Sequence, residues 1–380
     1  MADQVDQSDR RLPRAEVTVD LDAIRHNVAL LAGRAASSGA ATMAVVKADA
    51  YGHGALPVAK AALDAGATWL GLAALDEALA LRAAGITAPM LCWLNTADTD
   101  FRPGIATDID VAASSRRELD AIVDGARRAG RPARVHLKID TGLGRNGCPA
   151  DLWPALVDAA AAEEFVEVVG IWSHLACADE PGHPSIDEQA KRFDDAYRVV
   201  RAAGLEPMRH LANSAATLNR PDLHHDLVRV GIAMYGLNPL PDKEDLRPAM
   251  TFRSSVALTK RIAAGESVSY GHTWTAERDT RLALVPAGYA DGIPRGLSGR
   301  LEVWLAGRRR PVVGRVCMDQ VVVDCGEDPV AEGDIVTLFG SGVDGEPTAT
   351  EWASNLGTID YEIVTGMCRP RISRIYLGAR

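Results

Sequence analysis

Eight short apolar runs alternate with helical patterns through the first two thirds of the chain, and this alternation restricts the fold more than any other feature. The runs, in chain order, are TMAVVK, TWLGLA, PMLCWL, DIDVAA, ARVHLKI, VEVVGIWSH, MRHLA and LVRVGIA. Strands that alternate with helices form parallel βαβ units, and eight such units can close into a TIM-type barrel. The predicted class is therefore α/β, with a (β/α)8 barrel over residues 15–240. A doubly wound open sheet uses the same alternation and is the alternative.

The segments between these runs have the composition and the end signals of helices. LDAIRHNVALLAGRAA follows Asp20, a plausible N-cap. Four later helical patterns stop at glycines, namely Gly66, Gly85, Gly130 and Gly204. Glycine is the preferred residue just after a helix because it adopts the left-handed conformation without strain.

The pattern changes near residue 245. Segments such as SSVALTKRI, TRLALVPAGYADG and RLEVWLAG are short alternating strands separated by glycine turns, which predicts a β-rich domain over residues 245–380. AEVTVDL, near the N-terminus, also reads as a strand and could pair with this second domain. Residues 1–14 are polar, lack the apolar segment of a signal peptide, and are expected to form a flexible tail.

Composition excludes several classes of function. The 380 residues carry a formal net charge of −10, which argues against a nucleic acid or an anionic membrane as the main partner. No apolar run is long enough to span a membrane. The six cysteines form no C-x-x-C pair, so neither a zinc site nor a disulfide framework is indicated and a cytoplasmic protein is expected. The adjacent His224 and His225 are expected in a solvated loop, without a third ligand for a metal.

Polar residues that could take part in catalysis or binding follow the predicted strands. They are Lys47 after the first, Lys138 and Arg145 after the fifth, His174 after the sixth, Ser214 after the seventh, and Arg229, Gly231 and Ile232 at the eighth. In barrels of this kind the active site lies at the carboxyl ends of the strands, so these groups should converge.

Two of these features together suggest a cofactor. Ser214 at a helix start and the backbone amides around Gly231 could hold a phosphate, and barrels often bind phosphate after the last two strands. Taken singly, Ser214 could be only an N-cap and Lys47 a solvated strand-end lysine. A lysine and a phosphate site at one barrel mouth suggest pyridoxal 5′-phosphate held as a Schiff base.

Longer motifs then match a known family. The stretches AVVKADAYGHGA, HLKIDTGLGRNG, WSHLACADE, ANSAA, VRVGIAMYG, VSYGHTW, GYADGIPR, VGRVCMDQ and TIDYEIVTGM resemble those of bacterial alanine racemases, pyridoxal phosphate enzymes of fold type III. The resemblance covers nearly the whole chain after its first fifteen residues. It departs at Leu143 and Asn146, where methionine and an apolar residue are expected, and both flank Arg145.

The resemblance assigns roles to individual residues. It implies that Lys47 and Tyr270 are the two catalytic bases, acting on opposite faces of the substrate. The expected cofactor-binding set is Lys47, Tyr51, His174, Ser214, Arg229, Gly231, Ile232 and Tyr361; the expected substrate-binding residues are Arg145 and Met318; Lys138 is a possible carbamylated lysine. Arg229 would face the pyridine nitrogen, and because arginine stays protonated it could only donate to that atom.

The same resemblance implies that the chain interconverts L-alanine and D-alanine and so supplies D-alanine for cell-wall peptidoglycan. A homodimer with shared active sites is also expected, because the link NPLPDKEDLRPAM is short and Lys47 and Tyr270 stand in different domains. A racemase of another small amino acid such as serine, or a fold-type III decarboxylase, is the alternative. GLGRNG also matches a dinucleotide-binding pattern, but a lone match of this kind is weak. A pyridoxal phosphate-binding protein without turnover would lack the β-rich domain.

Overall fold

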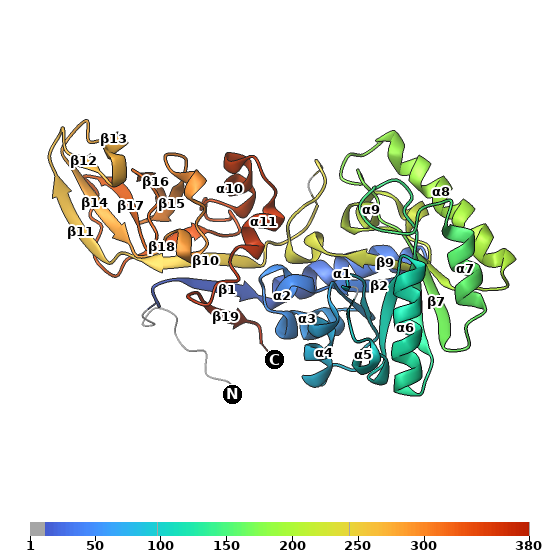
Figure 1. Ribbon diagram of the computed structural model, residues 1–380. Helices are drawn as coiled ribbons and strands as arrows, with labels where there is room; N and C mark the ends of the chain where they lie inside the picture. Colours follow the sequence, from blue (N-terminus) through green and yellow to red (C-terminus); the bar gives the residue numbers. More distant parts are fainter. Residues whose placement is uncertain (1–11, 97, 243, 380) are drawn as a thin grey trace. The chain divides into compact units, whose positions relative to one another are not determined.

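The computed structural model describes residues 12–96, 98–242 and 244–379. Residues 1–11, most of the expected flexible tail, lie outside the described residues. The chain divides into two compact units (Figure 1): the barrel unit, Asp22–Arg247, and the β unit, Met1–Leu21 with Pro248–Arg380. Compared with the expected domain ranges, the main difference is that residues 15–21 belong with the β-rich part.

The barrel unit contains an eight-stranded parallel sheet in the order β8-β7-β6-β5-β4-β3-β2-β9, which confirms the predicted TIM-type barrel. Its strands are β2 (Ala41–Val45), β3 (Trp69–Leu72), β4 (Met90–Cys92), β5 (Ile109–Ala113), β6 (Ala133–Lys138), β7 (Val166–Trp172), β8 (Met208–His210) and β9 (Leu227–Val230). Each of the eight apolar runs in the sequence corresponds to one of them. The sheet meets itself between β8 and β9, where the Arg229 amide donates to the Ala212 carbonyl at 3.0 Å.

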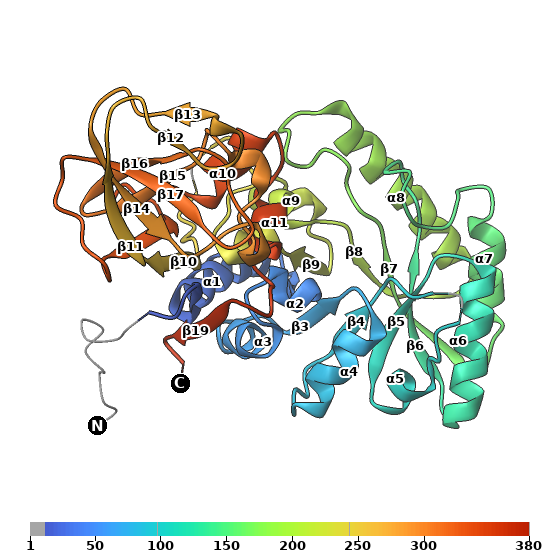
Figure 2. The ribbon, with the colours of Figure 1, turned by 60° about the vertical axis from the view of Figure 1, so that its left-hand side comes forward.

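Helices connect these strands, and Figure 2 shows α6 and α7 on the outer side of the barrel. They are α1 (Leu21–Ser37), α3 (Ala55–Asp64), α4 (Leu75–Ala83), α5 (Arg102–Ala106), α6 (Arg116–Ala129), α7 (Trp153–Ala161), α8 (Pro184–Ala202) and α9 (Ser214–Asn219). The two ends of α6 carry the capping residues from which the sequence predicts helix boundaries. Ser115 accepts the amide of Glu118 at its start, and Gly130 takes φ 69° at its end.

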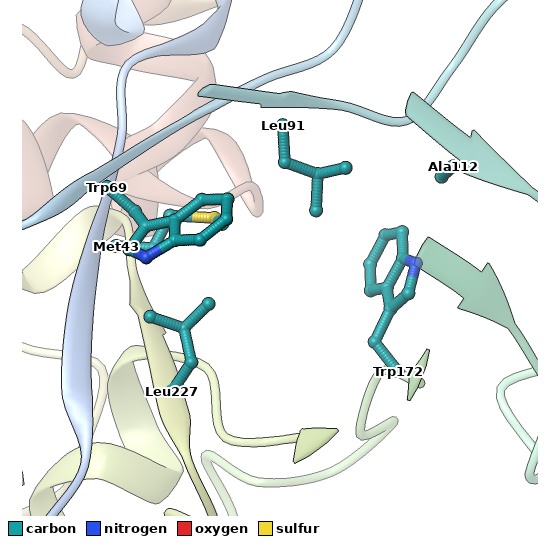
Figure 3. Close-up of a cluster of buried hydrophobic side chains, with 6 residues drawn as sticks. All are labelled: Met43, Trp69, Leu91, Ala112, Trp172 and Leu227. Atoms are coloured by element: carbon teal, nitrogen blue, oxygen red, sulfur yellow. The ribbon is translucent and has the colours of Figure 1, made fainter. Parts of the chain in front are cut away.

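Inside the barrel, side chains of alternate strand positions form a packed layer (Figure 3). The cluster consists of Met43, Trp69, Leu91, Ala112, Trp172 and Leu227. Side chains two residues apart on a strand share a face. Asp110, two residues before Ala112, therefore lies on the same interior face, and it is buried. The interior thus holds charged groups as well as apolar ones.

The β unit contains a nine-stranded sheet in the order β11-β14-β17-β16-β15-β18-β10-β1-β19. These strands are β1 (Glu16–Asp20), β10 (Met250–Ser255), β11 (Leu258–Ile262), β14 (Thr280–Val285), β15 (Glu302–Leu305), β16 (Arg308–Val313), β17 (Val321–Gly326), β18 (Ile335–Phe339) and β19 (Ser373–Leu377). The short strands β12 (Ser267–Val268) and β13 (Trp274–Thr275) pair separately, and α10 (Ala349–Leu356) and α11 (Asp360–Thr365) complete the unit. The N-terminal strand β1 pairs with β10 and β19, so the first strand of the chain is an interior strand of its last domain.

Within the described part of the chain, no helix is long and apolar enough to cross a membrane.

Candidate active site

Lys47 lies at the start of an unusual left-handed turn, α2 (Lys47–Tyr51), two residues beyond the end of β2. Residues 48–51 have φ values between 52° and 54°. An L-amino acid other than glycine pays roughly 1–2 kcal/mol per residue in this region, so four in succession need support from their surroundings. Non-glycine residues in such conformations cluster at functional sites.

Two carboxylates supply part of that support. The Ala48 amide donates to Glu77 Oε1 at 2.7 Å, and the Ala55 amide donates to Asp49 Oδ1, also at 2.7 Å. Hydrogen bonds to ionised acceptors are among the stronger ones in proteins. They fix the backbone on both sides of the turn and so fix the position from which Lys47 extends.

The surroundings of Lys47 favour its neutral form. Burial lowers the pKa of Lys47, the charge of Arg145 lowers it further, and Glu77 opposes both. Its Nζ lies 6.0 Å from the centroid of the Tyr51 ring. A lowered pKa increases the fraction of lysine in the free amine form, which a nucleophile or a base requires.

Ser214, Gly231 and Tyr51 come together near this lysine in a small cradle. The Ser214 hydroxyl oxygen accepts the amides of Gly231 at 2.8 Å and of Ala233 at 3.3 Å. A Cβ on Gly231 would lie 2.6 Å from the Tyr51 hydroxyl, so the close approach requires glycine. Ile232, the next residue, is buried. Hydroxyls and backbone amides at one point are groups that bind phosphate.

Ser214 does not cap its helix. The N-cap of α9 is Asn213, whose Oδ1 accepts the Ala216 amide at 3.1 Å. The simpler interpretation of Ser214 as a capping residue is therefore wrong, and its hydroxyl oxygen faces the amides that follow β9 instead.

Arg229 is buried on β9 among backbone carbonyls. Its Nη1 donates to the His210 carbonyl at 2.8 Å, and its Nη2 donates to the carbonyls of Ser173 at 2.7 Å and Leu211 at 3.1 Å. His174 Nδ1 lies 3.3 Å from Nη2. The guanidinium therefore links β7, β8 and β9 across the place where the barrel sheet closes.

Positive charge converges at this end of the barrel. His174 has its pKa held well below the usual value, first by burial and then by the charges of Arg229, Arg145, Lys138 and Lys47. His174 is therefore neutral at pH 7. Four basic side chains around one histidine, in a chain with a net charge of −10, mark a site for anionic groups.

Lys138 belongs to the same cluster. Burial lowers its pKa to about 8, and the charges of Arg229 and Arg145 add to this effect. Its Nζ lies 4.2 Å from the centroid of the Trp172 ring. At pH 8 about half of such a lysine is neutral, whereas an ordinary lysine, with a pKa of about 10.4, is almost entirely charged.

The loop that carries Arg145 is anchored by an unexpected residue. The Ser114 hydroxyl, just after β5, donates to Asn146 Oδ1 at 2.9 Å. Asn146, one of the two departures from the family pattern, therefore links the Arg145 loop to the end of a neighbouring strand.

These residues fit pyridoxal 5′-phosphate on their own chemistry. The cradle at Ser214 and Gly231 suits a phosphate, and the cations suit both that phosphate and a substrate carboxylate. The guanidinium of Arg229 contacts five acceptors, all of them through Nη1 and Nη2. Among the described residues its Nε–H contacts no acceptor, which leaves one donor for a ring nitrogen.

Three expected site residues belong to the β unit. Tyr270 is 72% exposed, Met318 is 52% exposed and Tyr361 is 37% exposed. Tyr270 stands between two residues with positive φ, Ser269 at 65° and Gly271 at 75°. The Ser269 hydroxyl donates to the Arg315 carbonyl at 3.0 Å, which holds the segment on which Tyr270 is presented.

Three buried polar residues inside the barrel, Asp110, His136 and His210, connect to Arg229 and are not among the predicted site residues. The sequence does contain a signal for them, because each is a polar residue in the middle or at the end of an apolar strand.

The expectation of a solvated pair at His224 and His225 was wrong for His224. That side chain is 1% exposed, and its Nε2 lies 3.0 Å from the Thr217 carbonyl. No cluster of three metal-ligating side chains occurs among residues 12–96, 98–242 and 244–379.

Comparisons with known proteins agree along the whole chain. Residues 19–239 match the family model "Alanine racemase, N-terminal domain", and residues 249–376 match "Alanine racemase, C-terminal domain". The alanine racemase of Salinispora arenicola (strain CNS-205) is 57% identical over 372 residues, which cover 97% of this chain and 99% of that protein. The alanine racemase of Frankia casuarinae (strain DSM 45818 / CECT 9043 / HFP020203 / CcI3) is 55% identical over 96% of each chain.

Solved structures give the same result. The crystal structure of alanine racemase from D-cycloserine producing Streptomyces lavendulae superposes with a TM-score of 0.94 at 52% identity, covering 98% of this chain and 99% of that one. Alanine racemase from Streptomyces coelicolor A3(2) gives a TM-score of 0.93 at 51% identity, covering 96% and 98%.

Proposed function

This chain belongs to the alanine racemase family and interconverts L-alanine and D-alanine, and from this premise we propose that it works with pyridoxal 5′-phosphate and two bases, Lys47 and Tyr270. The observation that carries the proposal is the lysine of lowered pKa beside a phosphate cradle and a group of cations. The alternatives, a racemase of another small amino acid and a fold-type III decarboxylase, are not favoured by these relatives.

We assign the cofactor contacts as follows. Lys47 would carry the cofactor; Ser214, Gly231, Ile232, Tyr51 and Tyr361 would hold its phosphate; Arg229, with His174 beside it, would donate to the ring nitrogen. When bound, the cofactor withdraws electrons from the substrate and so acidifies the proton on the α-carbon. The rest of the catalytic task belongs to side chains of the protein.

Racemisation requires removal of the α-proton on one face of the substrate and delivery of a proton on the other. Lys47 Nζ, with its lowered pKa, would accept or return a proton on one face. The Tyr270 hydroxyl would serve the opposite face. A free phenol has a pKa of about 10, so as a base near neutrality Tyr270 needs cationic neighbours.

The substrate carboxylate requires a counter-charge, which we assign to Arg145, with Met318 lining the substrate site. A guanidinium binds a carboxylate through two parallel hydrogen bonds and so fixes its orientation. We further propose that Lys138 is carbamylated, because a lysine with a pKa of about 8 has the neutral amine that attacks carbon dioxide. The carbamate would be an anion and would stabilise Arg145.

Tyr270 and Met318 are exposed in the β unit, which suits residues that complete a site on another surface. We therefore propose a homodimer in which the partner subunit's Tyr270 serves the Lys47 of this chain. In the cytoplasm, the location we expect, such a dimer would supply D-alanine for peptidoglycan.

The cofactor assignment is tested by reduction. Purified protein should absorb visible light, and borohydride should attach the cofactor covalently to Lys47, as peptide mapping by mass spectrometry would reveal. Attachment to Lys138 or to the exposed Lys60 would overturn the assignment. An assay of both enantiomers of the common amino acids should give the highest kcat/KM for alanine; a higher value for serine would establish the alternative substrate.

A further inference from the structure

A continuous row of buried polar side chains crosses the barrel interior from β5 to β9. Asp110 Oδ2 lies 3.1 Å from His136 Nε2, and His136 Nδ1 lies 2.9 Å from His210 Nε2. His210 Nδ1 then lies 3.3 Å from Arg229 Nη1. All four side chains are buried. We call this row, Asp110, His136, His210 and Arg229, the interior relay.

The two ends of the interior relay determine the direction of every hydrogen bond in it. At one end an ionised carboxylate can only accept, so His136 must donate from Nε2. At the other end the Arg229 guanidinium, which can only donate, faces His210 Nδ1, so neutral His210 accepts there and donates from Nε2 to His136 Nδ1.

The electrostatics of His210 and Arg229 agree with this direction. Burial, together with His136 and Arg229, holds the pKa of His210 well below its usual value, so its ring is neutral. Burial also lowers the pKa of Arg229, to about 9. Burying the positive charge of Arg229 is costly unless a negative charge balances it. Asp110 supplies that charge, and the hydrogen-bonded rings of His136 and His210, polarised by the carboxylate, link it to Arg229. Arg134 holds Asp110 at the far end, with Nε 2.9 Å from Oδ1.

The barrel makes room for the relay. A Cβ on Gly170, the residue paired with His136 on β7, would lie 2.2 Å from His136 Nδ1. The His210 ring stacks on Trp172, with centroids 5.6 Å apart and planes inclined by 8°. Both rings are thus held in place by packing, and neither can turn without disturbing the interior layer.

We propose that Asp110, His136 and His210 are positioning residues for the reaction: they fix the tautomers that hold Arg229 with its Nη groups occupied and its Nε–H directed to the cofactor ring nitrogen. The proposal rests on the proposed function, because it presumes that pyridoxal 5′-phosphate binds next to Arg229. None of the three residues would touch substrate or cofactor. Their effect would reach the chemistry through the orientation and charge of one guanidinium.

The tautomers can be measured in the unmodified holoenzyme. Selective ¹⁵N labelling of histidine and NMR should show that both His136 and His210 have a protonated Nε2 and an unprotonated Nδ1. A protonated Nδ1 on either ring, whether from the other tautomer or from an imidazolium, would overturn the proposal. This measurement needs no variant and does not depend on activity.

A pair of variants tests the effect on the cofactor. His210→Phe keeps a ring over Trp172 but breaks the relay, whereas Trp69→Phe disturbs the packing against His136, whose ring lies edge-on to Trp69 at 5.7 Å, and leaves every relay hydrogen bond in place. With ¹⁵N-labelled pyridoxal 5′-phosphate, His210→Phe should shift the resonance of the ring nitrogen, and Trp69→Phe should not. We expect kcat of His210→Phe to fall on the order of 100-fold, with a smaller change in KM, as for a misplaced catalytic group.

The outcomes separate the two proposals. If the wild-type protein binds no pyridoxal 5′-phosphate, the proposed function fails. If it binds the cofactor but the ring-nitrogen resonance is the same in wild type and His210→Phe, or moves equally in both variants, only the relay fails. If His210→Phe does not fold, the tautomers of His136 and His210 measured in the wild-type protein still test the relay.

Discussion

The lowered pKa of the single residue Lys138 should be detectable in the pH dependence of the stability of the whole protein. Its pKa is about 8 in the folded protein and near the ordinary value of 10.5 in the unfolded chain. Between these pH values the unfolded chain binds more protons, so the free energy of unfolding should rise with pH across this window. In carbonate-free buffer, the free energy of unfolding of the wild type, relative to that of Lys138→Met, should increase by at most about 3 kcal/mol from pH 8 to pH 10.5.

Urea denaturation at several pH values measures this difference. Lys60, which is exposed on α3, provides the control, because Lys60→Met should leave the pH dependence of the wild type unchanged. Parallel curves for the wild type and Lys138→Met would show that the pKa of Lys138 is not lowered by the fold.

The same neutral amine leads to a second prediction for Lys138. In bicarbonate-containing buffer at pH 8, carbon dioxide should add to Nζ, and ¹³C NMR with labelled bicarbonate should show a carbamate resonance. The modification converts a cation near Arg145 and Arg229 into an anion, so activity at subsaturating alanine should rise with bicarbonate. The resonance should be absent in Lys138→Met and present in Lys60→Met; equal signals in both would exclude Lys138 as the site.

At the scale of elements, the left-handed turn after Lys47 predicts that an alanine-to-glycine substitution stabilises the protein within the turn but destabilises it within an ordinary helix. Ala48 is exposed and has φ 52°, a conformation that costs an L-residue about 1–2 kcal/mol but costs glycine little. Ala48→Gly should therefore stabilise the protein by about 0.5–1 kcal/mol, after the entropy of the unfolded chain is deducted. Ala29, exposed within α1, provides the matched control, and Ala29→Gly should destabilise by about 1 kcal/mol.

Thermal or urea unfolding of the two variants checks the signs. Destabilisation by Ala48→Gly of the same size as by Ala29→Gly would contradict a strained turn. If Ala48→Gly stabilises the protein but lowers kcat, the turn contributes to catalysis by holding Lys47 rigidly.

The elements also show which parts of the fold the sequence predicts. All eight barrel strands are recognisable because each is a short apolar run bounded by helical patterns. The turn after Lys47 is not, because KADAY has ordinary right-handed helix formers and its left-handed form depends on a distant carboxylate, Glu77. Tertiary contacts decide here against local propensity.

The candidate site divides in the same way. Lys47, Ser214 and Arg229 are predictable because strand ends in a barrel converge. The interior relay is harder to predict, because Asp110 and His136 are polar residues within apolar strands, and their partners depend on which strands are neighbours. His224 is expected in a solvated loop because the sequence offers no third metal ligand, yet its ring is enclosed between Ser38 and Thr217.

At the scale of the whole molecule, the chain enters the β unit twice. β1 precedes the barrel in sequence but lies between β10 and β19 in the sheet, so the β unit is complete only after residues at both ends of the chain have been made. Val17 and Val19 on β1 are fully buried. The two units are therefore joined by two connections, at residues 21–22 and 247–248.

The last prediction concerns two chains. If each active site combines Lys47 of one chain with the partner subunit's Tyr270, two inactive variants, Lys47→Ala and Tyr270→Phe, should complement each other. A mixed dimer would then have one site that lacks both bases and one intact site. Random exchange of equal amounts makes about half of the dimers mixed, so about a quarter of the wild-type activity should return, from two-fold symmetry alone. If both bases act within one chain, every site in the mixed dimer lacks a base. An absence of recovery, once subunit exchange has been verified by mass spectrometry, would refute the shared site and leave the exposure of Tyr270 to be explained within a single chain.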